Sequence, residues 1–451
     1  MKTHLTPFRH QKMMHMKKFK LIFLIFISVN ASAQSKLITI EEAIATALQN
    51  NFDIQLSKND SMVAALDYSY RNAIFFPRIN ATLGTNWTGN KQNQEFSNGT
   101  KREGKVKTNN LNSSVAISWT LFDGLKMFAT RDKAAELIKL GSLGIQNQVT
   151  NSIAAVINTY YNIVRQKQMI KAIDEQMALS SERAKLAQYK LDIGVGAKPD
   201  VLQAKIDNNA QRALQLEQEA TMRQLKEQLI QLLNLKAPAS FDVSDSIPVN
   251  TSLTIDEITK DIEKSNPGLL IAQKGIDIAK YTLKERKAER WPTLSFNSAY
   301  NFSRTNNNVA LNPALPIFNQ NKGLNYGLTA SIPILNGLNT KRQIQQVKLN
   351  IRFQELAMEN QKAELSLAVT NAYLEYEQQL KALQLEEDNI VLAKENASIV
   401  FQVYKLNSTT LIQLKEAEKS LQDAYTRLIT ARYNAKLAET ELLRLKGDLV
   451  K

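Results

Sequence analysis

Cysteine is absent from the 451-residue chain, and all three histidines lie within the first fifteen positions. Removal of an N-terminal export segment would therefore leave a protein with neither residue type. Such a chain has no Cys/His nucleophile pair, Ser-His-Asp triad, histidine or thiolate metal site, or disulfide. The adjacent carboxylates Glu386 and Glu387 would point in different directions on a helix, so they do not form an acid–base pair. We therefore predict no enzymatic activity, no catalytic residue, no metal and no cofactor.

Glycine and proline are also scarce, with 15 and 10 residues, which favours long uninterrupted elements. Apolar residues recur at intervals of seven in three segments. These are Val149, Val156, Ile163, Ile170, Met177, Ala184 and Leu191 in 125–192; Val369, Tyr376, Leu383, Ile390, Ala397 and Tyr404 in 338–405; and Leu414, Leu421, Leu428, Ala435 and Leu442 in the last helix. This spacing predicts coiled-coil seams. A helix of about 68 residues would be roughly 100 Å long, so we expect extended helical hairpins.

The basic excess is smaller than the total suggests. The net charge is +14, but the first 33 residues contribute six basic side chains and no acid, leaving +8. Basic residues in the remainder alternate with Glu, Asp and Gln, as on solvated helix faces. We therefore predict no nucleic-acid partner.

The N-terminus has the organisation of a secretory signal. Lys17, Lys18 and Lys20 precede the apolar run 21–29, which is followed by Ala31-Ser32-Ala33. Nine to eleven apolar residues are too few for a membrane-spanning helix, which needs about twenty. We predict that residues 1–33 are a cleaved signal peptide, with either Met1 or Met16 as the start.

The remaining chain contains a tandem duplication. Five landmarks recur in the same order, 213 or 215 residues apart: 38–42 with 253–257, 76–79 with 291–294, 121–124 with 334–337, 158–160 with 371–373, and 189–191 with 404–406. We predict a first repeat at 34–235, a connector at 236–252 and a second repeat at 253–451. Each repeat would contain a short helix, two strands, a helix of about 68 residues and a shorter helix. The helical hairpins would span about 125–234 and 338–446.

Four segments alternate apolar and polar residues, as β-strands do: 78–88, 111–121, 293–302 and 324–334. Each is about ten residues long, which suits a membrane-spanning strand, although a soluble sheet with one buried face alternates in the same way. Trp87, Trp119, Tyr300 and Tyr326 could form belts at the membrane interface. Four strands cannot close a barrel, so a membrane location would require several copies of the chain. Residues 89–110 and 303–323 are expected to be long loops outside the cell.

In this order of features the chain resembles the TolC family of outer-membrane efflux proteins. The corners 120–124 and 332–337 look like that family's strand-to-helix corners, and 193–195 looks like its helix-tip turn. The resemblance implies a mainly α-helical trimer, with a twelve-stranded barrel in the outer membrane of a Gram-negative bacterium and a helical tunnel across the periplasm. It also implies an equatorial region formed by 34–45, 236–260 and the C-terminus. The implied partners are two further copies, outer-membrane lipid, a periplasmic adaptor and an inner-membrane transporter of the RND or ABC type.

The resemblance also assigns roles to single residues near the periplasmic tip. Asp200 and Tyr404 match a pair that holds the tip closed, whereas Pro199 and Thr409 replace a second tie. Gln413 and Glu416 match an acidic constriction of the pore, of which one carboxylate remains. The tip turns, where an adaptor would dock, contain Ile193, Gly194, Val195 and Asn407. Alternatively, Tyr404 packs in the heptad seam, Asp200 caps a helix and Glu416 is a solvated surface charge.

The predicted function is that of a passive exit duct with a gated periplasmic tip, serving a tripartite efflux or type I secretion system. The alternative is a trimeric coiled-coil protein with a structural or adhesive role and no conduction. The motifs do not identify the exported substrate or the pump class.

Overall fold

The computed structural model describes residues 36–235, 241–312 and 314–449. The predicted signal peptide, 1–33, and residues 236–240 of the predicted connector lie outside this part. The elements in chain order are β1 Lys36–Leu37, α2 Ile40–Asn50, α3 Phe52–Ser69, the 3₁₀ helix η1 Arg71–Phe75, β2 Arg78–Glu95, β3 Lys101–Phe122, α4 Lys126–Asp192, α5 Lys198–Leu233, β4 Phe241–Asp242, α6 Ile255–Thr259, α7 Ile262–Ser265, α8 Pro267–Ala288, β5 Thr293–Asn307, β6 Phe318–Ser331, α9 Asn339–Lys405 and α10 Leu411–Lys446.

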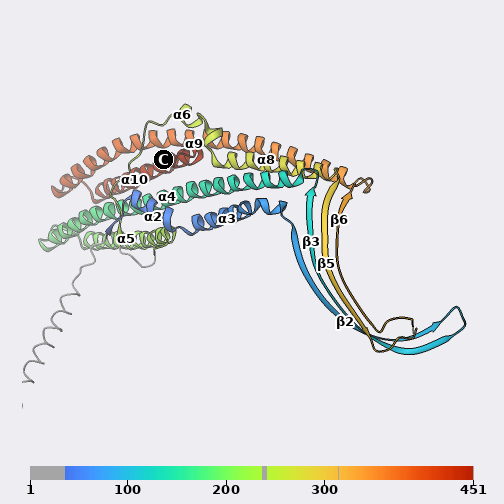
Figure 1. The fold of residues 1–451 in the computed structure, drawn as a ribbon. Helices are drawn as coiled ribbons and strands as arrows, with labels where there is room; N and C mark the ends of the chain where they lie inside the picture. Colours follow the sequence, from blue (N-terminus) through green and yellow to red (C-terminus); the bar gives the residue numbers. More distant parts are fainter. Residues whose placement is uncertain (1–35, 236–240, 313, 450–451) are drawn as a thin grey trace, which may run out of the picture. The chain divides into compact units, whose positions relative to one another are not determined.

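The order of elements confirms the tandem repeat. Each half contains short helices, two long strands, a helix of 67 residues and a helix of 36 residues. In each half the second long strand, β3 or β6, leads into the 67-residue helix through a short corner (Figure 1).

In 36–235, 241–312 and 314–449, none of the helices has the length and apolarity that crossing a bilayer requires.

The predicted heptad seams are buried in α9 and α10, where all eleven seam positions have little exposed surface. In α4 the prediction holds for Val156 and Ile163, but Val149, Ile170 and the predicted positions after Ile170 are only half-buried. The buried series there is Gln166, Ile173, Ser180 and Ala187. Because a straight helix drifts by about 20° per heptad, a strict interval of seven does not stay on one face over 67 residues.

The chain divides into two compact units, and α4, α9 and α10 each contribute to both. The first unit comprises 36–50, 155–249 and 382–436 of the described residues, and it contains both hairpin turns. Its β1 pairs in parallel with β4. The buried Tyr160 donates a hydrogen bond to the Ile38 carbonyl at 2.9 Å and accepts one from the Ser244 amide at 3.1 Å. This tyrosine therefore fixes both segments against α4.

The second unit comprises 51–154, 250–381 and 437–449, and it contains the four-stranded sheet. The predicted equatorial region is thus divided, because 36–45 and 241–249 belong to the first unit and 250–260 and the C-terminus to the second. In the second unit Tyr376 has a position like that of Tyr160, since its hydroxyl donates to the Asn250 carbonyl at 2.5 Å.

The sheet is antiparallel with the strand order β2-β3-β5-β6 (Figure 1). Its strands contain 18, 22, 15 and 14 residues, so the predicted loops at 89–110 and 303–323 are wrong. Most of these residues continue the strands, and the connections are only 96–100 and 308–317. The sequence pattern ends early because both faces become polar there, although the backbone hydrogen bonds continue.

The two strand-to-helix corners share an unusual backbone. Gly124 and Leu125 both have positive φ, as do Gly337 and Leu338 at the matching corner. At the first corner a Cβ on Gly124 would lie 2.4 Å from the Ala288 carbonyl oxygen, whereas nothing lies within 4 Å at Gly337. The repeated motif therefore forms the same turn in both halves, and at Gly124 the nearby Ala288 carbonyl also leaves no room for a side chain.

Candidate functional site

The turn between α4 and α5 is a tight hairpin end at 193–197. The amides of Val195 and Gly196 donate to the Lys190 carbonyl at 3.0 and 2.8 Å, which satisfies the last turn of α4. Gly194 has a φ of +80°, a conformation that strains other residues. The side chains of Ile193 and Val195 are more than half exposed, so this turn presents two apolar groups to its surroundings.

The turn between α9 and α10 is held to α4 by Lys190. Asn407 has a φ of +57°, as expected for a non-glycine residue in a hairpin turn. The Lys190 ammonium donates to the Asn407 side-chain oxygen at 2.5 Å and lies 4.6 Å from the centre of the Tyr404 ring. One lysine of the first hairpin therefore contacts two residues of the second.

Helix α10 begins with a capping box that involves Gln413. The Thr410 hydroxyl accepts a hydrogen bond from the Gln413 amide at 3.2 Å, and the Gln413 side-chain oxygen accepts one from the Thr410 amide at 3.2 Å. The Thr409 hydroxyl donates to the same oxygen. Gln413, predicted at a pore constriction, thus has a local structural task, and the Thr-x-x-Gln spacing could have revealed it.

Asp200 and Tyr404 interact through charge. Within the described chain the Asp200 carboxylate makes no hydrogen bond to the Tyr404 hydroxyl, although burial and the Asp200 charge both raise the pKa of Tyr404. Tyr404 is buried with Phe401 and Leu414, so the packing interpretation of this residue is correct. The N-cap interpretation of Asp200 is wrong, because Ala197 is the N-cap of α5 and Asp200 lies in the first turn.

A buried ionic cluster that the sequence analysis missed joins the two hairpins on the tip side of the first unit. Arg183 of α4 has an exposed fraction of 1% and donates to Asp207 of α5 and Glu418 of α10, each at 2.5 Å. Asp207 also accepts hydrogen bonds from Gln203 at 2.9 Å and from Lys415 at 3.2 Å. The cluster therefore connects three helices through one guanidinium group.

The two carboxyl groups of this cluster have opposite pKa shifts. Burial raises the pKa of Glu418 above its usual value, and the charge of Arg183 only partly opposes this effect. Burial also acts on Asp207, but hydrogen bonds from Gln203 and Lys415 and the charge of Arg183 outweigh it, so its pKa is lowered. One oxygen of Glu418 and the Nε of Arg183 have no hydrogen-bond partner, which makes the Glu418 side the weaker one.

Glu416, the predicted constriction residue, has the opposite environment. It is exposed and forms no ion pair among the described residues, whereas Glu418, two positions further along α10, is buried. The exposed position is what a side chain facing a lumen requires, and it equally suits a solvated charge.

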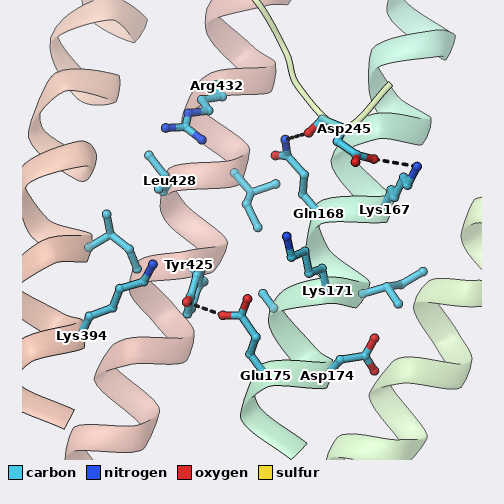
Figure 2. A pocket seen from close by; sticks show the side chains of 14 residues that line it. Lys167, Gln168, Lys171, Asp174, Glu175, Asp245, Lys394, Tyr425, Leu428 and Arg432 are labelled. Atoms are coloured by element: carbon cyan, nitrogen blue, oxygen red, sulfur yellow. Dashed lines mark hydrogen bonds and ion pairs between the residues drawn. The ribbon is translucent and has the colours of Figure 1, made fainter. Parts of the chain in front are cut away.

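An open groove of about 630 Å³ lies between α4, α9 and α10 of the first unit (Figure 2). Tyr425 donates to Glu175 at 2.6 Å across it, and Lys394 lies 5.0 Å from the centre of the Tyr425 ring. Lys167 pairs with Asp242 at 2.5 Å and Asp245 at 2.7 Å. Four basic and three acidic side chains line the groove, so it has little preference for either sign of charge.

The two faces of the sheet differ sharply in polarity. One face contains, from the four strands, Asn80, Thr82, Asn86, Asn112, Ser114, Ser118, Ser295, Asn297, Asn301, Asn325 and Thr329, with glycine and alanine between them. Along all four strands this polar face has two charged residues, Arg78 and Arg102, each near one end. The other face contains Ile79, Leu83, Val115, Ile117, Phe296, Tyr300, Phe302, Leu324 and Leu328.

All four predicted interface aromatics lie on this apolar face. Trp119 and Trp87 lie near opposite ends, because Trp87 pairs with Asn109, ten positions along β3 from Trp119. Ten residues of a tilted strand span about 25 Å of bilayer depth. We call the residues that pair with one another across the four strands a row. Tyr326 lies near the helical end, in the row of Ile117. Tyr300, in the row of Val115, lies inside the band, so its predicted place at the interface does not fit.

The indole N–H of Trp119 donates to the Phe75 carbonyl at 2.8 Å, which anchors this ring at the strand-to-helix corner.

Comparison with known proteins identifies the family. The family model described as "Outer membrane efflux protein" matches residues 43–235 and 258–448, once for each repeat. The chain is 21% identical over 442 residues to "Outer membrane protein TolC" of Salmonella enteritidis, covering 97% of this chain and 87% of the relative. It is 22% identical over 345 residues to "Outer membrane efflux protein BepC" of Brucella suis, covering 74% and 72%. Among solved structures, the outer-membrane channel OprN matches with a TM-score of 0.74 and 16% identity, covering 91% and 90%.

The chain therefore belongs to the outer membrane efflux protein family. It is an outer-membrane exit duct, located in the outer membrane of a Gram-negative bacterium.

Proposed function

We propose that three copies of the chain form the working channel. The observation that supports this most strongly is the sheet, in which β2 and β6 are open edges and one face is apolar. An open edge cannot exist in lipid, so neighbouring copies must supply the missing partners. Three sheets give twelve strands, with the apolar face toward lipid and the polar face toward a water-filled lumen.

The helical hairpins of the three copies would form the periplasmic tunnel, closed at the tip by the inner hairpin α9–α10. Within each copy, the contacts of Lys190 with Asn407 and Tyr404 and the Arg183 cluster hold this hairpin to α4 and α5. Opening would require that some of these contacts break. Three copies of Glu416 would place a ring of negative charge at the constriction, which attracts cations.

The duct has no energy source of its own in this proposal. An inner-membrane transporter of the RND or ABC type would drive export, and a periplasmic adaptor would dock on the exposed turns around Gly194 and Asn407. The chain itself is not an enzyme, and it transports cargo passively.

The decisive experiment is current measurement on purified trimers in planar lipid bilayers. We expect stable voltage-driven conductance, with a preference for cations that falls in Glu416→Gln. Tyr404→Phe, which keeps the buried ring and removes the hydroxyl, should increase entry of large antibiotics into cells. A folded trimer without current in any lipid would instead support a structural or adhesive coiled-coil protein.

A further inference from the structure

Basic residues gather at one end of the lipid-facing side of the sheet. Toward the strand connections, Lys322 lies in the row of Ser113 and Arg304 in the next row, that of Leu111. The row of Trp87 follows without a basic residue, then the row of Lys107, and then the row that Lys105 and Lys91 share. On this face, the rows from Val115 to Trp119, at the helical end, contain no charged side chain on any of the four strands. The positive charge is therefore confined to the part of this face that lies toward the strand connections.

Four of these cations have no acidic partner within the described chain. Lys91 pairs with Glu103, but Lys105, Lys107, Arg304 and Lys322 form no ion pair there. Arg304 lies 5.3 Å from the centre of the Phe318 ring, and Lys322 lies 5.7 Å from that of Phe302. Both rings orient the cations on the outer face, as in aromatic and basic interfacial belts.

The other face is closed to a ligand at this level. Asn308, in the β5–β6 connection, exchanges hydrogen bonds with the backbone of Lys107, and the Arg102 side chain donates to the Leu311 carbonyl at 2.8 Å. Val106 is buried there, while the side chains of Lys105 and Lys107 are exposed on the lipid-facing side. The free cations therefore have one accessible side.

We propose that Lys107, Arg304 and Lys322 form a binding surface for the phosphate groups of the outer-leaflet glycolipid, lipid A. The outermost two of their rows, those of Lys322 and Lys107, differ by about 14 Å in membrane depth. The row of Trp87 and Phe318, at the level where headgroups replace acyl chains, lies between them. Long basic side chains extend toward this level. The connection end of the sheet faces away from the helices, so the surface lies in the outer leaflet, which carries phosphorylated glycolipid. This inference rests on the membrane placement in the proposed function.

The test measures lipid binding to purified trimers in detergent. Native mass spectrometry and the temperature of trimer dissociation would be recorded with bisphosphorylated lipid A, with dephosphorylated lipid A and with phosphatidylglycerol. We expect tight binding of the first lipid only. Lys107→Gln/Arg304→Gln/Lys322→Gln should weaken it roughly 100-fold, because each basic residue contributes several-fold to attraction of an anionic headgroup.

The matched control removes one arginine and two lysines elsewhere. Arg212, Lys348 and Lys381 are exposed and form no ion pair among the described residues, so Arg212→Gln/Lys348→Gln/Lys381→Gln should leave lipid A binding unchanged. Equal binding of phosphorylated and dephosphorylated lipid A, or of phosphatidylglycerol, would overturn the inference. So would equal losses in both triple variants. Bilayer conductance distinguishes failure of the proposed channel from failure of the proposed lipid surface. A wild-type trimer that conducts but binds phosphorylated and dephosphorylated lipid A equally refutes only the lipid surface.

Discussion

Arg183 shows how one side chain can hold several long helices together. Its guanidinium is buried and contacts carboxylates from α5 and α10. No local pattern predicts this, since Asp207 and Glu418 are 24 and 235 residues away in the sequence. By contrast, the seam residues of α10, such as Leu414 and Leu442, were predictable because their spacing alone determines which face is buried.

We predict that Arg183→Met destabilises the protein by about 3–5 kcal/mol, because it leaves the buried Glu418 carboxylate without its paired cation and removes one of the two cations that contact the half-buried Asp207. Urea unfolding followed by the helical circular dichroism signal measures this loss. Arg212→Met, at an exposed position, should change stability by less than about 0.5 kcal/mol. Equal effects at the two sites would show that the buried cluster contributes nothing particular.

The raised pKa of Glu418 gives a pH-dependent prediction. A carboxyl group whose pKa is higher in the folded state stabilises the fold below its unfolded pKa, and this contribution is lost as pH rises through the folded pKa. Glu418→Gln removes that loss. The melting temperature of the variant minus that of the wild type should therefore increase as the pH rises from 4 to 7. Asp207 has a lowered pKa, and Asp207→Asn should show the opposite trend over the acidic range. Parallel curves for both variants would contradict these assignments.

At the scale of elements, the sequence predicted types and order well and strand ends poorly. Four of the five repeated landmarks correspond to element ends, corners or hairpin turns, where backbone geometry requires particular residues, whereas 158–160 and 371–373 lie inside α4 and α9. The strands were predicted too short because lysine, asparagine and glutamine occupy both faces beyond Trp87, so apolar and polar residues no longer alternate there. The backbone hydrogen bonds that continue the strands do not depend on side-chain type and cannot be recognised from the sequence. Tyr160 matches Tyr373 in the repeat, yet the buried tyrosine of the second half is Tyr376.

The two corners allow a matched pair of substitutions. Gly124→Ala places a methyl group against the Ala288 carbonyl in addition to the strain of positive φ, whereas Gly337→Ala meets only that strain. We expect a loss of about 1 kcal/mol for Gly337→Ala and at least 2 kcal/mol more for Gly124→Ala. Chemical unfolding of the two variants, or their yields of assembled protein, would reveal the difference. Similar losses would mean that the first corner relaxes at no cost.

At the scale of the whole molecule, membrane placement is testable with the aromatic residues. Single-tryptophan variants that keep Trp87 or Trp119 should be quenched more by lipids brominated near the headgroup than by lipids brominated near the chain ends. Tyr300→Trp in a background without other tryptophans should show the reverse, because its row lies inside the apolar band. Identical quenching profiles at the three positions would contradict the depth order derived from the strand register.

The polar face of the sheet has a consequence for traffic. Amide, hydroxyl, glycine and alanine groups cover most of it between Arg78 and Arg102, so in the proposed trimer a dissolved ion that passes along this face meets no fixed charge over most of the wall. Water beside such a surface stays similar to bulk solvent, and cationic, anionic and zwitterionic molecules all pass without adhering. Selection among exported molecules must then take place before they enter the channel, and one channel can serve inner-membrane transporters of different kinds.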